Sequence, residues 1–214
     1  FGMLLQDIVG IEAIINRVVV HMPMEKQMKW IQETHSKYEI DNLIIVGGES
    51  SKQQYPGPTV NDSLKRISEG NKHRKSNILC GGICIPSRKK ESKNLISKSK
   101  VGAEFFTTQV LCDSGNVIRM IKNYQERCDR ANTFPRRILL SFAPVSSQRN
   151  INFLKWLGVE IPKDTERYLN GRPGAMTDRS LDVAIEVLNE ILDYIIQNNL
   201  RVPVGLNVEH IICL

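Results

Sequence analysis

The sequence predicts an α/β protein in which helices cover a parallel sheet. Three observations predict it: segments with helical periodicity alternate with short apolar runs, those runs are continuously apolar, and turn residues separate the two kinds of segment. Continuously apolar strands are typical of parallel sheets that are covered on both faces. Because 214 residues with 41% hydrophobic content can bury one core, we expect a single domain over residues 1–214.

The expected elements follow one order along the chain. Strands are apolar runs that end at glycine or proline, and helices repeat apolar residues at helical spacing. Helices are expected at 3–13, 24–38, 60–69, 90–101, 116–132, 146–157 and 178–198, strands at 17–22, 42–46, 77–85, 105–109, 137–142 and 204–208, and a loop at 49–58. Six strands are too few for a closed eight-stranded barrel. Either the sheet is open and doubly wound, or two amino-terminal βα units lie outside the chain given.

Polar residues gather at the carboxyl end of the expected strand 105–109. Thr107, Thr108, Gln109 and Asp113 stand there, after a helix whose last turn is basic. In parallel α/β proteins ligands bind at the carboxyl ends of the strands. The sequence therefore predicts a ligand-binding face at this strand end.

Charge and composition limit the classes of partner. The formal charge is +6, and the densest basic run, residues 88–100, contains no aromatic side chain to stack a base. A solvated helix face or a phosphate-binding edge explains this run better than nucleic acid, so no nucleic-acid partner is expected. No apolar run reaches the roughly 18 residues of a membrane span, so we expect a cytoplasmic protein without a membrane partner.

The five cysteines are odd in number, and most lie in apolar runs, which favours buried free thiols over disulfides. Cys80 and Cys84 have no second ligand pair, and we expect no metal site. If the chain is complete, its open strand edges predict a homo-oligomer.

Five motifs in order resemble one family. GAEFFTTQ at 102–109, followed by Cys112 and Asp113, resembles the GADFxITQxxxD signature of methylenetetrahydrofolate reductases, which are flavin-dependent TIM barrels. Four other segments are similar to family motifs in the right order: DNLIIVGGE at 41–49, GGICIPSR at 81–88, APVSS at 143–147 and GLNVE at 205–209. The resemblance implies a (β/α)8 TIM barrel with about six of its eight strands in this chain. The family's catalytic glutamate would then lie before Phe1.

The resemblance also implies an activity. A protein of this family reduces a methylene-tetrahydrofolate, or here a related tetrahydropterin, to the methyl form by hydride from reduced FAD, with NAD(P)H as the electron donor. This chemistry belongs to one-carbon metabolism and methionine biosynthesis. Two alternatives stay open: a non-catalytic pterin-binding partner of a methyltransferase, and a flavin-independent reductase that takes hydride directly from a nicotinamide.

Three residues match family positions near the substrate. Gln109 matches the folate-contacting glutamine, and its amide offers a donor and an acceptor to the edge of a pterin; the alternative is a glutamine bonded to nearby loop backbone. Glu49 stands where the family has an aspartate beside flavin and pterin, and we assign it the catalytic role of tuning hydride transfer; the alternative is a turn residue. Leu154 replaces a phenylalanine that stacks on the substrate, so apolar contact would remain without stacking.

Four residues match the family's cofactor-binding positions: Gly48, Glu91, Asn94 and Lys98. Asn94 and Lys98 share one helix face, where an amide and a cation can bind a diphosphate; the alternative for the three helical residues is ordinary exposed surface. Other family contacts are replaced. Gly47, Val60, Ser97 and Val208 stand where the family has arginine, tyrosine, arginine and arginine.

Overall fold

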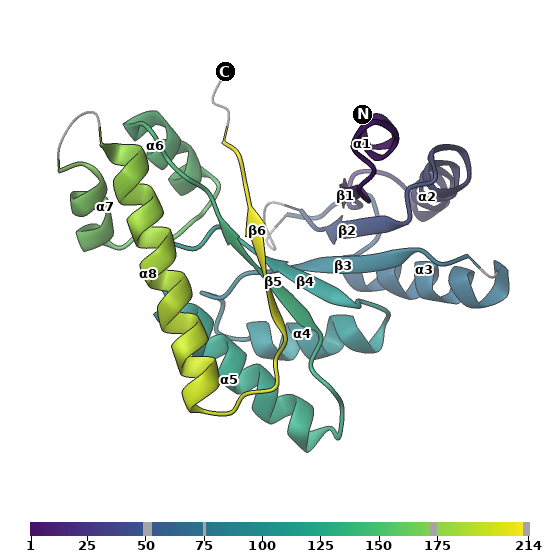
Figure 1. The fold of residues 1–214 in the computed structure, drawn as a ribbon. Coiled ribbons are helices and arrows are strands. Elements are labelled where there is room, and N and C mark those ends of the chain that lie inside the picture. The colour runs from purple at the N-terminus through teal and green to yellow at the C-terminus, as the bar shows by residue number, and fades with distance from the viewer. Residues whose placement is uncertain (49–52, 75, 172–174, 212–214) are drawn as a thin grey trace. The chain divides into compact units, whose positions relative to one another are not determined.

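The computed structural model describes residues 1–48, 53–74, 76–171 and 175–211 (Figure 1). The chain forms two compact units: one of Phe1–Ile83 with Asn94–Phe106, the other of Cys84–Lys93 with Thr107–Leu214. Within the described residues six strands alternate with eight helices, which confirms the predicted α/β class with six strands in this chain. That the chain is one domain remains a prediction.

The first unit is built on parallel strands with α3 packed on β2. Its core includes Leu43, Ile45 and Leu64, none more than 1% exposed. The strands pair in register, with Ile14 opposite Asn42 and Leu43 opposite Cys80. The elements that begin or end in this unit are α1 (Gly2–Val9), β1 (Ile14–Val18), α2 (Met24–Tyr38), β2 (Asn42–Val46), α3 (Val60–Arg74), β3 (Leu79–Cys84), α4 (Glu91–Lys100) and β4 (Phe105–Thr108).

Gly102 makes the turn from α4 into β4. Its φ is +119°, a value that residues with a side chain rarely adopt. The Ala103 amide donates to the Lys98 carbonyl at 2.9 Å, which closes the end of the helix. A glycine is therefore needed at this point of the GAEFFTTQ motif.

The second unit pairs β5 with β6 in parallel, from Ile138 opposite Val204 to Phe142 opposite Val208. Helix α8 contacts both α5 and α7. A buried cluster of Val145, Ile151 and Leu154 helps to form its core. The remaining elements of the unit are α5 (Gly115–Arg130), β5 (Arg137–Phe142), α6 (Gln148–Trp156), α7 (Lys163–Leu169), α8 (Met176–Gln197) and β6 (Val204–Val208).

The first strand differs from its prediction. A buried strand at 17–22 is wrong: β1 occupies Ile14–Val18, and its residues are exposed or half-buried in alternation. The chain leaves the sheet after Val18, and the buried residues Val19 and Val20 lie under the segment that contains Gly57, whose amide donates to the Val20 carbonyl at 2.8 Å. The run 17–22 therefore pairs in the sheet only at its start, where Arg17 and Val18 lie opposite β2 and the Val19 amide donates to the Val46 carbonyl, and its buried part lies under a loop.

Two helices also differ. No helix is expected between residues 157 and 178, yet α7 forms there, after Pro162. It buries only Leu169, so it carries no apolar periodicity that could predict it. Helix α1 ends early, at Val9, because Gly10 adopts a left-handed conformation with φ +71°.

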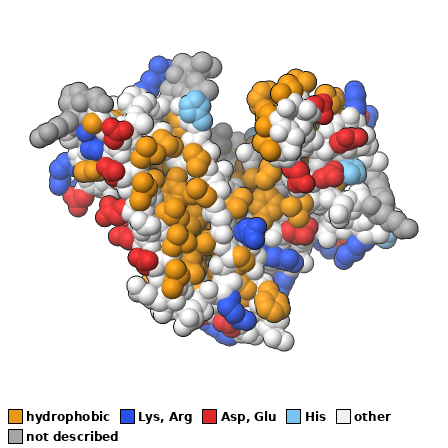
Figure 2. Space-filling model, viewed as in Figure 1, with side chains coloured by type: hydrophobic (Ala, Val, Ile, Leu, Met, Phe, Trp, Pro, Cys, Tyr) orange, Lys and Arg blue, Asp and Glu red, His pale blue; other side chains and the backbone are white. Residues whose placement is uncertain are grey.

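Apolar side chains remain exposed on the second unit. Leu181 and Ile185 of α8 are 43% and 57% exposed, and Leu206 and Val208 of β6 are 56% and 65% exposed. Figure 2 shows orange side chains gathered over α8 and β6. The apolar stripe predicted on 178–198 is thus only partly covered by this unit, and the homo-oligomer stays a prediction. No described helix is both long and apolar enough to cross a membrane.

The described cysteines are free thiols, as predicted. Cys80, Cys84 and Cys128 are buried and Cys112 is half-buried, while Cys213 lies outside the described residues. Burial raises the pKa of Cys80 to about 12 and that of Cys112 to about 11. At neutral pH both are therefore protonated and poorly nucleophilic.

Candidate functional site

A polar network crosses the strand ends of the second unit. Its members are Thr107 from β4, Ser141 from β5, Asn207 from β6, and Glu209, which follows β6. Thr107 Oγ1 and Ser141 Oγ are 3.1 Å apart, and Asn207 Nδ2 donates to Ser141 Oγ at 3.0 Å and to Glu209 Oε1 at 3.1 Å. Hydroxyl, amide and carboxyl groups therefore meet at the carboxyl ends of these strands.

Strand register explains why these side chains meet. Ser141 lies directly opposite Asn207 in the pairing of β5 with β6, so both point to the same face. The Ser141 amide donates to Thr108 Oγ1 at 2.9 Å, which ties β5 to the end of β4. Thr107 and Ser141 are 5% and 0% exposed. Buried polar groups cost stability unless they are hydrogen-bonded, and here they bond to one another.

Glu209 is the acid of this network. Its amide donates to the Phe142 carbonyl at 2.8 Å, which holds the residue just beyond the paired part of β6. Burial raises the pKa of the Glu209 carboxyl, and a hydrogen bond from Ser141 partly opposes that rise. A carboxyl with a raised pKa keeps its proton to higher pH and can act as a proton donor.

The raised pKa of Glu209 predicts a pH-dependent stability. The folded protein holds this proton more tightly than the unfolded chain, so the contribution of Glu209 is fully present below the ordinary value of 4.5 and is lost as pH rises through the raised value. We expect the Glu209→Gln variant to lose less unfolding free energy than wild type over that interval, as measured by urea denaturation at a series of pH values. The exposed Glu33→Gln variant should follow the wild-type profile, and a Glu209→Gln profile that also follows it contradicts the prediction.

Gln109 directly follows β4, two residues after Thr107 of the network. Its Nε2 donates to the Leu157 carbonyl at 2.9 Å, and its amide donates to the Cys84 carbonyl. The hydrogen bond to the Leu157 carbonyl holds the amide nitrogen of the Gln109 side chain in place. Within the described part of the chain, no hydrogen bond to Gln109 Oε1 is found.

A small hollow opens next to Gln109. It is lined by Gln109, Asp113, Asn116 and Glu160, among others, and its volume is about 30 Å³. That volume holds about one water molecule. A ligand larger than a water molecule therefore does not fit inside this hollow.

Two predicted cofactor residues belong to the first unit, on α4. Lys98 Nζ donates to the Ile83 carbonyl at 2.5 Å, so its ammonium is turned to the end of β3. Asn94 is half-buried one turn earlier on the same helix. Neither residue is simple exposed surface, and the charge of Lys98 is already engaged by backbone.

Gly48 also belongs to the first unit and follows β2. A Cβ at this position would lie 2.2 Å from the ring of Tyr55, so the ring of Tyr55 covers the glycine. The Tyr55 ring in turn packs edge-on against His21, with centroids 5.5 Å apart. Because Gly48 has no side chain, the Tyr55 ring can lie against its backbone, and the space that a ligand could have used is filled by Tyr55. Glu49, the predicted catalytic residue, lies outside the described residues.

Glu91 and Leu154 of the second unit are buried. Glu91 is 1% exposed, and its Oε1 accepts from the Ile85 amide at 3.2 Å, so the alternative of an exposed helix surface is wrong for this residue. Leu154 is 2% exposed and packs in the core with Val145 and Ile151. Both residues are packed inside this unit, and the binding roles predicted for them remain predictions.

Sequence reasoning did not single out Ser141, Asn207 and Glu209. The available signal was a single polar residue inside an apolar run, as in RILLSF and VGLNV. A single polar residue in a strand indicates a polar site only when the strand register shows that a second polar residue lies opposite it.

No protein-family model matches the sequence, and no curated protein matches it either. Among solved structures, an uncharacterised protein from Clostridium thermocellum that binds two copies of 5-methyl-5,6,7,8-tetrahydrofolic acid is similar to this chain. The two share 18% sequence identity with a TM-score of 0.68, over 99% of this chain and 93% of that one. The carboxyl transferase domain of Rhizobium etli pyruvate carboxylase, solved with 3-bromopyruvate, is more distant: 13% identity and a TM-score of 0.46, over 94% of this chain and 38% of that one. The likeness to the Clostridium protein, over nearly the full length of both chains, shows that this chain shares its fold.

Proposed function

We propose that this chain binds a reduced folate or a related tetrahydropterin over the network of Thr107, Ser141, Asn207 and Glu209, with Gln109 at its side. The observation that carries the proposal is a set of amide and carboxyl groups at the carboxyl ends of β4, β5 and β6. The fold supports it, because the similar Clostridium thermocellum protein binds 5-methyltetrahydrofolate. The resemblance of residues 102–109 to a folate-binding signature points to the same ligand.

The chemistry of the amide acceptors fits a pterin. Asn207 Nδ2 donates to Ser141 and Glu209, and Gln109 Nε2 donates to Leu157, so the oxygen of each amide is left as an acceptor. The amino group and ring N–H groups of a tetrahydropterin are donors. Acceptors whose orientation is fixed in advance bind such donors with little loss of side-chain entropy.

Binding is tested by titrating the purified chain with 5-methyltetrahydrofolate and measuring heat or intrinsic fluorescence. Saturable binding by the wild type is expected. Gln109→Ala removes one acceptor and should weaken binding by about tenfold, since one hydrogen bond contributes roughly 1 kcal/mol or more. The matched control is Gln148→Ala, because Gln148 is exposed on α6 and bonds only to Asn152 among the described residues. No binding by the wild type would overturn the proposal, and equal binding by Gln109→Ala would remove Gln109 from it.

A second candidate is the reductase activity that the sequence resemblance implies. Glu209 favours it, because a carboxyl with a raised pKa beside the ligand could supply the proton that accompanies hydride transfer. In such a reductase, Glu209 would serve as the proton donor in place of the catalytic glutamate of the family, which the resemblance puts before Phe1.

The residues expected to hold FAD do not fit that task in their present arrangement. Lys98 is bonded to the Ile83 carbonyl, Glu91 is buried, and Gly48 lies under Tyr55. We therefore derive no step through a flavin. The reductase is tested by supplying methylenetetrahydrofolate with NADH or NADPH, with and without FAD, and measuring methyltetrahydrofolate. Product that depends on Glu209 would support the enzyme, and none under any condition would leave the pterin-binding partner of a methyltransferase as the function.

A further inference from the structure

The first unit contains a groove between α2 and α3, and none of its lining residues belongs to the proposed pterin site. Its volume is about 420 Å³, within the range of small-molecule sites. Three isoleucines of different elements line it: Ile31 of α2, Ile67 of α3 and Ile78, which precedes β3, and they are only 3%, 4% and 7% exposed. They give the groove an apolar floor.

The polar side chains of the groove are basic or neutral. Arg66, His73 and His35 line it, whereas no aspartate or glutamate of the described residues does. The Arg66 side chain is 62% exposed, and its ion pair with Glu69, at 4.0 Å, is exposed and weak. The lining therefore favours an anion over a cation.

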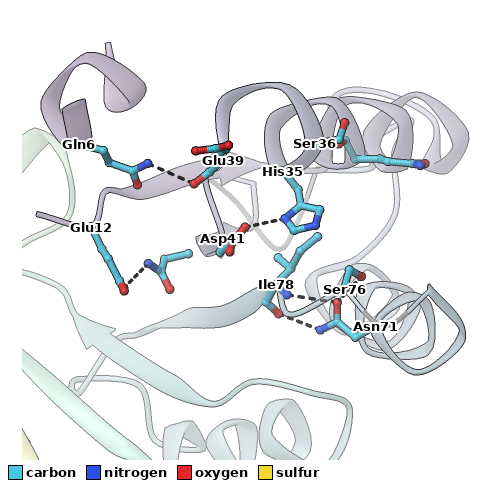
Figure 3. A network of polar contacts seen from close by, with 11 residues as sticks. Gln6, Glu12, His35, Ser36, Glu39, Asp41, Asn71, Ser76 and Ile78 are labelled. Atoms are coloured by element: carbon cyan, nitrogen blue, oxygen red, sulfur yellow. Dashed lines mark hydrogen bonds and ion pairs between the residues drawn. The ribbon is translucent and has the colours of Figure 1, made fainter. Parts of the chain in front are cut away.

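His35 is oriented by a carboxylate. Its Nδ1 lies 2.5 Å from Asp41 Oδ1, and Figure 3 shows the two side chains pointing toward each other. Because a carboxylate accepts, the hydrogen is on Nδ1, and Nε2 of the neutral ring is then an acceptor that can bind a donor group of a ligand. The Asn71 side chain, also shown in Figure 3, is hydrogen-bonded to Ile78 and Ser76. These bonds hold the wall of the groove in place.

Gly70 is the least expected residue of the groove. It lies inside α3, where glycine weakens a helix relative to alanine. A Cβ built on it meets no atom of the described protein within 4 Å, so packing within the unit does not require a glycine. Gly70 therefore weakens the helix without improving the packing of the unit. Its place at the lining of the groove is explained if a ligand approaches the backbone closely there.

We propose that this groove binds a small anion with an apolar body, that is, an aromatic or branched carboxylate, sulfonate or phosphate. The apolar body packs over Ile31, Ile67 and Ile78 and against Gly70. The anionic group is bound by Arg66, and His35 Nε2 is left to accept from a donor group of the ligand. The groove shares no residue with the proposed pterin site, so either proposal can fail without the other.

The test uses anilinonaphthalene sulfonate, an anionic aromatic dye whose fluorescence rises on burial, titrated into the full chain. One saturable site is expected. Arg66→Gln should weaken binding about tenfold, because a charge-assisted contact is lost. Lys29→Gln, which removes an exposed lysine of α2 outside the groove, should bind as wild type does.

Gly70→Leu tests the groove itself. Leucine is a good helix former, so this variant should remain folded by circular dichroism while its side chain fills the groove and dye binding falls at least tenfold. Phenylnaphthylamine, the dye without its sulfonate, should bind the wild type more weakly than the sulfonate does. Binding that survives both Arg66→Gln and Gly70→Leu would place the dye on another apolar surface, such as that over α8 and β6, and would overturn the proposal. Equal binding of the two dyes would show that the sulfonate does not contribute to binding, and would overturn the proposal that the groove binds an anion.

Discussion

Replacing Gly102 by alanine should lower the free energy of unfolding by roughly 3 kcal/mol, the sum of backbone strain and overpacking. The strain arises because φ is +119° at this position. The overpacking arises because a Cβ would lie 2.8 Å from Ser68 Cβ and 3.2 Å from the Leu64 carbonyl oxygen. Leu64 is fully buried, so the backbone of α3 cannot move aside without disturbing the core of the first unit.

The measurement is urea denaturation followed by circular dichroism, with thermal unfolding as a second readout. For a chain of this size the loss corresponds to a fall in Tm of about 6 to 12 °C. Gly70→Ala is the matched control, since it makes the same chemical change inside a helix with open space at the Cβ. That variant should gain up to about 1 kcal/mol. Equal midpoints for the two variants would show that the turn after α4 tolerates a side chain.

Gly102 and Gln109 also show how much the sequence could predict. Both lie in one continuous motif, and the elements around them, α4 and β4, end within a few residues of their predicted positions. Glycine at a helix end and polar residues at a strand end are local signals. The alternation of apolar strands and helices is local too, and it was sufficient for the α/β class.

The rest of the site depends on contacts that are distant in sequence. Ser141 and Asn207 are 66 residues apart, and only the pairing of β5 with β6 makes them neighbours. Lys98 has a long side chain with many rotamers, and nothing local determines that it bonds to the Ile83 carbonyl and not to a phosphate. Burial of Glu91 and Leu154 likewise depends on what packs against their helices.

Asn207→Asp should reduce binding of methyltetrahydrofolate by about 10- to 100-fold at neutral pH, because a buried polar contact that loses its partner costs roughly 1–3 kcal/mol. The aspartate has the same shape but cannot donate to Ser141 Oγ or Glu209 Oε1, which now accept at 3.0 and 3.1 Å. It also places a second carboxylate beside Glu209. The pair can relieve its repulsion only by taking up a proton or by moving apart, and both alter the acceptors offered to the pterin.

The two neighbouring carboxyls of Asn207→Asp predict a pH dependence of binding that a misfolded variant would not show. Binding by Asn207→Asp should recover as the pH falls, because one proton shared between the two carboxyls restores a donor in the network. The double variant Asn207→Asp with Glu209→Gln exchanges the amide and the carboxyl, so the side chain at 209 can donate and Ser141 can turn its hydroxyl toward the aspartate. Isothermal titration of the single and double variants measures both effects. Rescue by the double variant is expected if the ligand lies over this network, and wild-type affinity in Asn207→Asp would show that the pterin binds elsewhere.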